Sequence, residues 1–127
     1  MNFEFILYVS DQKRAADFYS AVLQMPPSLN VPGMTEFTLA DNLKLGLMPE
    51  NGIAKIVTPA MAHPSSGAGI PRCELYLSVE DVKTIYARAI HAGAKEVSSP
   101  ADRDWGDYVG YVADSDGHVI AFAKKIS

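Results

Sequence analysis

The sequence has 127 residues, of which 48% are hydrophobic and 20% charged, and its formal net charge is -4 at pH 7. This length suits one compact core, and the composition is that of an ordinary globular protein rather than a disordered chain. The acidic balance argues against nucleic acid as the main partner, and no apolar run approaches the roughly 20 residues that cross a bilayer. A single cysteine and an N-terminus without signal-peptide features lead us to expect a cytoplasmic protein that does not act at a membrane.

The first half of the chain predicts a strand, a helix and a hairpin in that order. Residues 3–9 are rich in aromatic and β-branched side chains, which is typical of a strand. Asp11 is a suitable N-cap for a helix that must end before Pro26-Pro27. The apolar runs 36–39 and 43–48 predict two strands joined by a short turn.

The stretch 51–71 has a different composition, with many proline, glycine and serine residues. We expect a long connecting arm there, because so many proline, glycine and serine residues rarely occur within a helix or strand. After it, residues 73–79 predict a strand and Asp81 opens a helix that ends at Gly93. Two further strands, 108–113 and 118–123, follow and are joined by an Asp-Ser-Asp-Gly turn.

This order suggests an internal repeat. Glu4, Leu7, Val9 and Asp11 align with Glu74, Leu77, Val79 and Asp81 under the shared pattern E-x-x-L-x-V-x-D. A different offset matches the strands Leu-Tyr-Val-Ser and Leu-Tyr-Leu-Ser but puts the two helix caps out of step. We therefore prefer the first alignment.

The motifs in both halves resemble the glyoxalase/bleomycin resistance protein/dioxygenase (vicinal oxygen chelate) superfamily. The first half carries Leu7-Tyr8-Val9-Ser10-Asp11 and a Phe-Tyr-Ser-Ala-Val-Leu helix, in which Gln24 stands where the family commonly has glycine. The second half carries Ala92-Gly93-Ala94, Trp105-Gly106 and an Asp-Ser-Asp-Gly-His-Val-Ile ending. The resemblance implies one α+β domain over 1–127, with two βαβββ modules (about 1–50 and 72–127) whose mixed sheets curl around a central cleft.

The same resemblance implies where a divalent metal is held in the metal-dependent members. Two of the four ligand positions fall on Glu4 and Glu74, the residues that the repeat also pairs, and the others fall at Gly46 and Ala121. Glycine and alanine offer no donor, whereas a catalytic site needs about three protein ligands. We therefore expect no resident cofactor, with a weakly bound divalent metal on Glu4 and Glu74 as the alternative.

Glu4 and Glu74 are also the candidate catalytic residues. Two carboxyls in one cavity repel each other, which raises at least one pKa and can yield metal-free acid/base chemistry or capture of a cation. The structural alternative is that they bond to Arg72, Lys44 or a hydroxyl and only orient the sheet. The three histidines are scattered, and we expect His118 to be exposed.

The expected ligand-binding residues combine aromatic side chains with two small ones. Gly46 and Ala121 would enlarge a pocket where other family members crowd a metal, and close packing is the structural alternative. Aromatic side chains would line the pocket, because ligand sites are mostly apolar; they are Phe37, Tyr76, Trp105, Tyr108 and Tyr111. Trp105 is the strongest candidate, since it lies in an irregular segment rather than in a strand.

From these features we predict a homodimeric small-molecule binding protein of this superfamily that lacks the full catalytic metal site. The alternative is a glyoxalase-type lyase or isomerase, similar to lactoylglutathione lyase, that uses a divalent metal. A module serving a larger assembly is a third interpretation. The sequence leaves open whether the protein is an enzyme.

Overall fold

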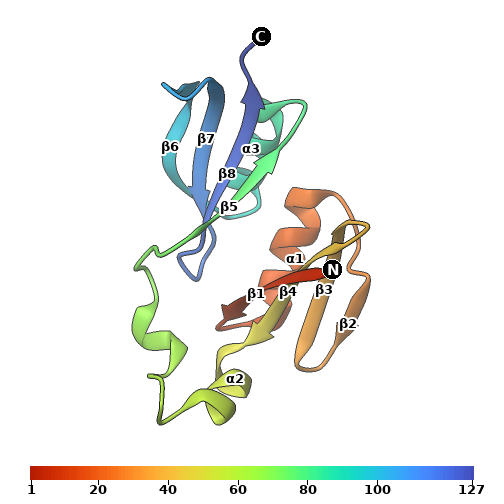
Figure 1. The fold of residues 1–127 in the computed structure, drawn as a ribbon, viewed down its shortest axis with the longest axis vertical. Helices are drawn as coiled ribbons and strands as arrows, with labels where there is room; N and C mark the ends of the chain where they lie inside the picture. Colours follow the sequence, from red (N-terminus) through yellow and green to blue (C-terminus); the bar gives the residue numbers. More distant parts are fainter. The chain divides into compact units, whose positions relative to one another are not determined.

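In a computed structural model that describes residues 1–127, the chain divides into two units of similar architecture, Met1–Ala68 and Gly69–Ser127. Each unit holds one four-stranded mixed sheet with a helix that follows its first strand (Figure 1). This confirms the predicted α+β class and the βαβββ order of both modules. No helix is long and apolar enough to cross a membrane.

The first sheet has the strand order β1-β4-β3-β2, in which β1 runs parallel to β4 and the other neighbours are antiparallel. Asp11 caps the helix as predicted, because its Oδ1 accepts the backbone N–H of Arg14 at 3.0 Å. The elements of this module are β1 (Phe3–Val9), α1 (Gln12–Leu23), β2 (Leu29–Val31), β3 (Met34–Ala40) and β4 (Leu43–Pro49).

Alternation along the strands gives the first sheet two different faces. One face packs on the apolar side of α1 and forms the core; its most buried side chains are Val9, Tyr19, Val22, Phe37, Leu45 and Leu47. The other face carries the residues that alternate with these, among them Glu4, Lys44 and Gly46. The predicted metal positions of this module, Glu4 and Gly46, therefore lie opposite α1, whereas the predicted pocket residue Phe37 faces α1.

The prediction of a long connecting arm over 51–71 was wrong in part. Residues Glu50–Val57 form the helix α2, and Pro64–Gly67 form a short 3-10 helix, η1. The apolar residues Ile53, Ala54 and Val57 have helical spacing, and Ala54 is buried. Packing of this apolar side therefore stabilises a helix despite the proline and glycine residues around it.

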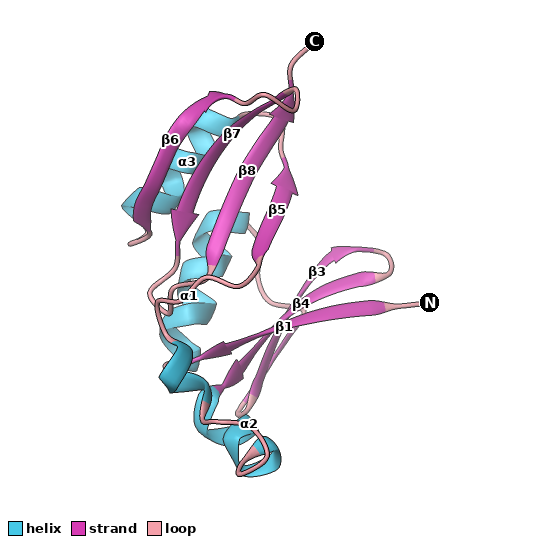
Figure 2. Ribbon diagram, turned by 60° about the vertical axis from the view of Figure 1, so that its left-hand side comes forward, coloured by secondary structure: helices cyan, strands magenta, loops and turns pink.

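The second module repeats this plan with the strand order β5-β8-β7-β6, and Figure 2 shows α3 lying against one face of its sheet. Asp81 caps α3 by accepting the N–H of Thr84 at 3.1 Å, and Gly93 after the helix has the expected positive φ of 109°. The two N-caps therefore coincide in the preferred repeat alignment. The elements are β5 (Glu74–Ser78), α3 (Val82–His91), β6 (Lys95–Asp102), β7 (Asp107–Ala113) and β8 (Val119–Lys125).

Strand β6 continues through Pro100 with two register shifts. Proline is tolerated there since β6 is an edge strand. Gly110 on β7 faces this segment, and a Cβ at that position would lie 2.8 Å from both Pro100 Cγ and Tyr86 Cδ2. A glycine is thus required where α3 packs closely on the sheet.

Candidate functional site

In the first module, Glu4 pairs with a carboxyl that the sequence analysis did not single out. Glu36 on β3 is in register with Gly46, and Gly46 is in register with Ile6 on β1, so Glu4 and Glu36 lie on the same face across β4. A hydrogen bond with the Glu36 carboxyl is the main cause that raises the pKa of Glu4, followed by partial burial and the like charge of Glu36. Lys44 opposes these effects.

The interaction with the Glu36 carboxyl therefore favours the protonated form of Glu4, and Lys44 lies beside the pair. The Lys44 Nζ lies 3.5 Å from Glu36 Oε1, and half of the lysine side chain is exposed. An ion pair of this length at the surface adds little stability. The arrangement is a protonatable acid pair with one nearby cation. In the sequence, the available signal for Glu36 was its position two residues from Met34 in a strand whose side chains alternate between two faces.

Gly46 does not enlarge a pocket as we expected. A Cβ at this position would lie 2.6 Å from Glu4 Oε2, which shows that the Glu4 carboxyl itself occupies the space above the glycine. The same Cβ would lie 3.2 Å from Ile6 Cγ1 and 3.3 Å from Met34 Sδ. Gly46 therefore permits the carboxyl pair to form.

Apolar side chains surround this pair on the face opposite α1. The large ones that remain exposed there are Ile6, Tyr8, Leu29 and Val31. Phe37 does not join them: it is in register with Leu45 and fully buried in the core. Its placement removes Phe37 from the candidate ligand-binding residues, since alternation turns it toward α1.

In the second module, most of the candidate residues share the face opposite α3. Tyr76 on β5 and Tyr111 on β7 flank Ala121 on β8 in direct register, and Glu74 follows the same alternation. Burial raises the pKa of Tyr111 above that of an ordinary tyrosine, the charge of Glu74 raises it further, and Arg103 lowers it. These residues share one face of the sheet, and their role in binding stays a prediction.

Two candidates of this module are placed differently from our expectation. Tyr108 alternates with Val109 and therefore turns to the other side of the sheet from Tyr111. Ala121 is on the predicted face but is fully buried in a cluster with Val109 and Ala123, against which Tyr111 packs. Ala121 thus fills space in the packing and does not open a cavity.

Trp105 lies in the turn between β6 and β7, with 55% of its surface exposed. Its Nε1–H donates to the Tyr76 hydroxyl at 3.0 Å, and this hydroxyl donates to Asp107 Oδ2 at 2.5 Å. Burial and the bond to Asp107 raise the pKa of Tyr76, while the bond from Trp105 lowers it. Asp107 was missed in the sequence, where it was only one of several acids in an irregular segment.

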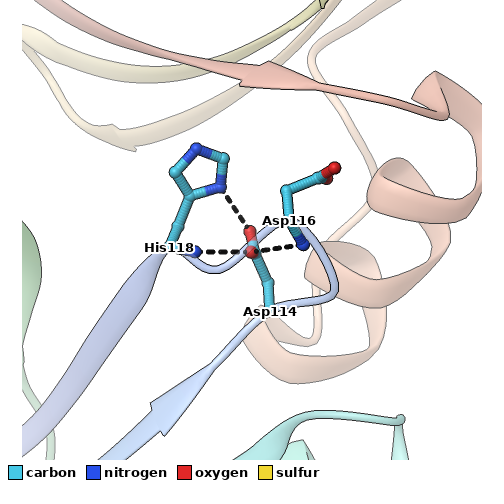
Figure 3. A group of neighbouring side chains, drawn as sticks. All are labelled: Asp114, Asp116 and His118. Carbon is cyan, nitrogen blue, oxygen red and sulfur yellow. Dashed lines mark hydrogen bonds and ion pairs between the residues drawn. The ribbon is translucent and has the colours of Figure 1, made fainter. Parts of the chain in front are cut away.

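The turn between β7 and β8 also gathers possible metal ligands that the sequence analysis missed. One ligand atom from each of Asp114, Asp116 and His118 lies within 4.8 Å of the others (Figure 3). Asp114 Oδ1 accepts the backbone N–H groups of Asp116 and His118 at 3.0 and 2.8 Å, and its Oδ2 lies 2.8 Å from His118 Nδ1. The Asp114 carboxylate thus holds the turn together.

This placement corrects the expectation that His118 is exposed, since only 25% of its side chain is accessible and that of Asp114 is nearly buried. The alternating acids of Asp114-Ser115-Asp116-Gly117 were the sequence signal. The residues do not occupy the ligand positions implied by the resemblance. At the two remaining positions that the resemblance implies, Gly46 has no donor atom and Ala121 is buried.

Comparisons with known proteins support the family and the fold. Residues 3–122 match the family model described as "Glyoxalase/Bleomycin resistance protein/Dioxygenase superfamily". Uncharacterized proteins of Mycobacterium bovis and Mycobacterium tuberculosis are 31% identical over 123 residues, which is 94% of this chain and 80% or 72% of theirs.

Solved structures share the fold at lower identity. A glyoxalase-related enzyme from Fulvimarina pelagi superposes with a TM-score of 0.82 at 21% identity, covering 96% of this chain and 86% of that one. A glyoxalase/bleomycin resistance protein/dioxygenase family enzyme from Burkholderia phytofirmans gives 0.82 at 16% identity, with 97% of each chain covered. At these identities the likeness concerns the fold alone.

Proposed function

Because the chain belongs to the glyoxalase/bleomycin resistance protein/dioxygenase superfamily, we propose that it binds a small molecule and lacks a complete catalytic metal site. One observation carries the proposal: the two ligand positions without donor atoms are filled. The Glu4 carboxyl occupies the space over Gly46, and Ala121 is packed against its neighbours. Glu4 and Glu74 alone fall short of the three or so protein ligands of a catalytic divalent site.

The chemistry of the remaining side chains supports a binding role. Ligand sites combine a mainly apolar lining with a few polar groups that fix orientation. The face opposite α1 has this character, with exposed Ile6, Tyr8 and Val31 around the acid pair of Glu4 and Glu36. With a net charge of -4, the protein favours a neutral or cationic ligand.

A native mass spectrum combined with metal analysis tests this function on protein purified without chelator. We expect a bound small molecule, or one captured from a metabolite extract, together with transition metal well below one equivalent. A stoichiometric transition metal and no captured molecule would contradict the proposal.

A metal-dependent lyase or isomerase of the glyoxalase type is the second candidate. The raised pKa of Glu4 favours it, because a carboxyl that stays protonated to higher pH can exchange protons with a substrate. Formation of S-lactoylglutathione from methylglyoxal and glutathione, measured with and without added Mn²⁺ or Ni²⁺, tests this candidate. Activity that disappears in Glu4→Gln would favour the enzyme over the binding protein.

The oligomeric state and the location belong to the same proposal. We propose a homodimer in the cytoplasm, since each sheet leaves strand edges unpaired and two-fold dimers are the commonest closed assemblies.

A further inference from the structure

Three polar side chains between positions 51 and 65 form a hydrogen-bonded chain that the binding function does not use. His63 Nε2 lies 2.9 Å from Asn51 Oδ1, and His63 Nδ1 lies 2.9 Å from Ser65 Oγ. The imidazole therefore joins an amide on α2 to a hydroxyl on η1. A hydroxyl, an imidazole and a group that orients the imidazole are the parts of an activated serine, which is recognised by geometry rather than by sequence position.

Backbone hydrogen bonds hold the two ends of this segment. Beyond the last residue of α2, Met61 N–H donates to Val57 O at 2.8 Å. In η1, Ala68 N–H donates to Ser65 O at 3.2 Å. The side chains are thus carried by a folded backbone on both sides of His63.

The backbone also determines the tautomer of the His63 ring. Ser65 N–H donates to His63 Nδ1 at 3.1 Å, and since a backbone N–H can only donate, Nδ1 carries no proton. A neutral imidazole then has its proton on Nε2, which donates to Asn51 Oδ1. The Ser65 hydroxyl must likewise donate to Nδ1. Nδ1 is therefore the basic atom, and the Ser65 proton already points at it.

The exposure of the three residues suits a reaction at the serine. Ser65 is exposed, so a reagent can reach its hydroxyl, whereas His63 is half-buried. The adjacent serine is different, because the Ser66 hydroxyl donates to the backbone carbonyl of His63 at 2.7 Å. Of these two neighbouring hydroxyls, only that of Ser65 is bonded to a base.

We propose that Ser65 is a nucleophile that accepts acyl groups from thioesters or aryl esters, with His63 as its general base and Asn51 as a positioning residue. Ser65 Oγ forms a bond to the acyl carbon while the bond from that carbon to sulfur or to the phenolic oxygen breaks. The proton passes from Oγ to His63 Nδ1 and then to the departing thiolate or phenolate.

The arrangement also limits the donors that can react. Nδ1 must release the Ser65 N–H when it takes the hydroxyl proton, and the loss of a hydrogen bond costs free energy. Donors with a good leaving group meet this cost, and ordinary alkyl esters and amides do not. This activity goes beyond the binding function proposed above and uses none of its residues.

An alkyl fluorophosphonate is the first probe, because a nucleophilic serine displaces its fluoride and keeps a stable phosphonate ester. We expect one label per full-length chain, located on Ser65 by peptide mass spectrometry. Ser65→Ala should abolish the label, and His63→Gln should slow labelling at least about tenfold. Ser66→Ala is the matched control and should be labelled at the parent's rate, since its hydroxyl does not contact the imidazole.

Two substitutions of Asn51 separate positioning from structural damage. Asn51→Ala removes the acceptor of the Nε2–H and should slow labelling about threefold. Asn51→Asp keeps an acceptor oxygen and should retain the parent's rate. Heteronuclear NMR of the imidazole gives a readout without any reagent, and it should find the proton on Nε2 in the parent protein.

Release of p-nitrophenolate from p-nitrophenyl acetate tests the acyl transfer itself. The parent should release it faster than Ser65→Ala and should carry a transient acetyl group on Ser65. Labelling that is absent, that spreads over several residues, or that is unchanged in His63→Gln would overturn the proposal. A ring proton on Nδ1 would overturn it as well. Ligand capture that is equal in the parent and in Ser65→Ala leaves the binding function standing in either case.

Discussion

Gly46→Ala tests the acid pair of the first module with the smallest possible change. The added Cβ would lie 2.6 Å from Glu4 Oε2, closer than a real contact permits, so this carboxyl must move. The contacts of 3.2 and 3.3 Å to Ile6 and Met34 need shifts of only a few tenths of an ångström. The substitution therefore separates Glu4 from Glu36 and leaves the rest of the sheet in place.

The expected size of the effect depends on pH. Loss of one hydrogen bond costs about 0.5 to 1.5 kcal/mol, and replacing glycine returns about 0.5 kcal/mol of backbone entropy. We expect Gly46→Ala to be destabilised by up to about 1 kcal/mol at pH 4.5. Above the raised pKa of Glu4 the parent loses this bond and its carboxylates repel each other, so the difference should shrink or change sign as the pH rises.

The direction follows from proton linkage. The folded state raises the pKa of Glu4, so it binds a proton that the unfolded state has already released. The contribution of the pair is therefore fully present at low pH and is lost as the pH rises through the raised pKa. Gly46→Ala should remove this part of the pH dependence.

Urea unfolding of both proteins between pH 4.5 and 8 measures the effect. Gly52→Ala is the matched control, because a Cβ at position 52 meets nothing within 4 Å. It should stabilise α2 by about 0.5 to 1 kcal/mol at every pH. An unfolding free energy for Gly46→Ala that differs from the parent by the same amount at all pH values would refute the effect of Glu36 on the pKa of Glu4.

Four other outcomes follow from the same structure. Gln24 ends α1 with a φ of 51°, so Gln24→Gly should raise the unfolding free energy by about 0.5 to 1 kcal/mol in urea titrations, and no gain would contradict the strain. Ala121→Glu places a carboxyl at a fully buried position and should lower the unfolding free energy by about 3 kcal/mol or more at pH 8, and by less at pH 5. Recovery of stability on addition of Mn²⁺ would indicate an unexpected metal site. Dialysis against a chelator should leave the melting temperature nearly unchanged, whereas a drop of several degrees restored by one metal would favour the metalloenzyme. Sedimentation at micromolar concentration should report a dimer, and a monomer would contradict the proposed assembly.

The sequence predicted the module plan well because local signals and packing agree there. Asp11 and Asp81 are N-caps at matching places in the repeat, and both accept the backbone N–H three residues later. Helix α2 was missed because the proline and glycine residues around it outweighed a short apolar pattern. Such short helices depend on tertiary packing, which a single sequence does not display.

The sequence named candidate site residues without showing which of them share a face. In the structure Tyr76, Tyr111 and Ala121 lie on one side of the second sheet. The sequence did not reveal that Ala121 is covered by packing or that Glu4 bonds to Glu36. Partner choice depends on strand register and on side-chain reach, and both arise only when distant segments pair.

The edges of the two sheets are unequal. Strand β2 has only three residues, and β6 is interrupted by Pro100 and two register shifts, so neither offers a long run of free backbone groups. Strands β1 and β5 at the opposite edges contain no proline and no register shift. Backbone pairing with another polypeptide is therefore confined to one side of each module, the side formed by the strand with which that module begins.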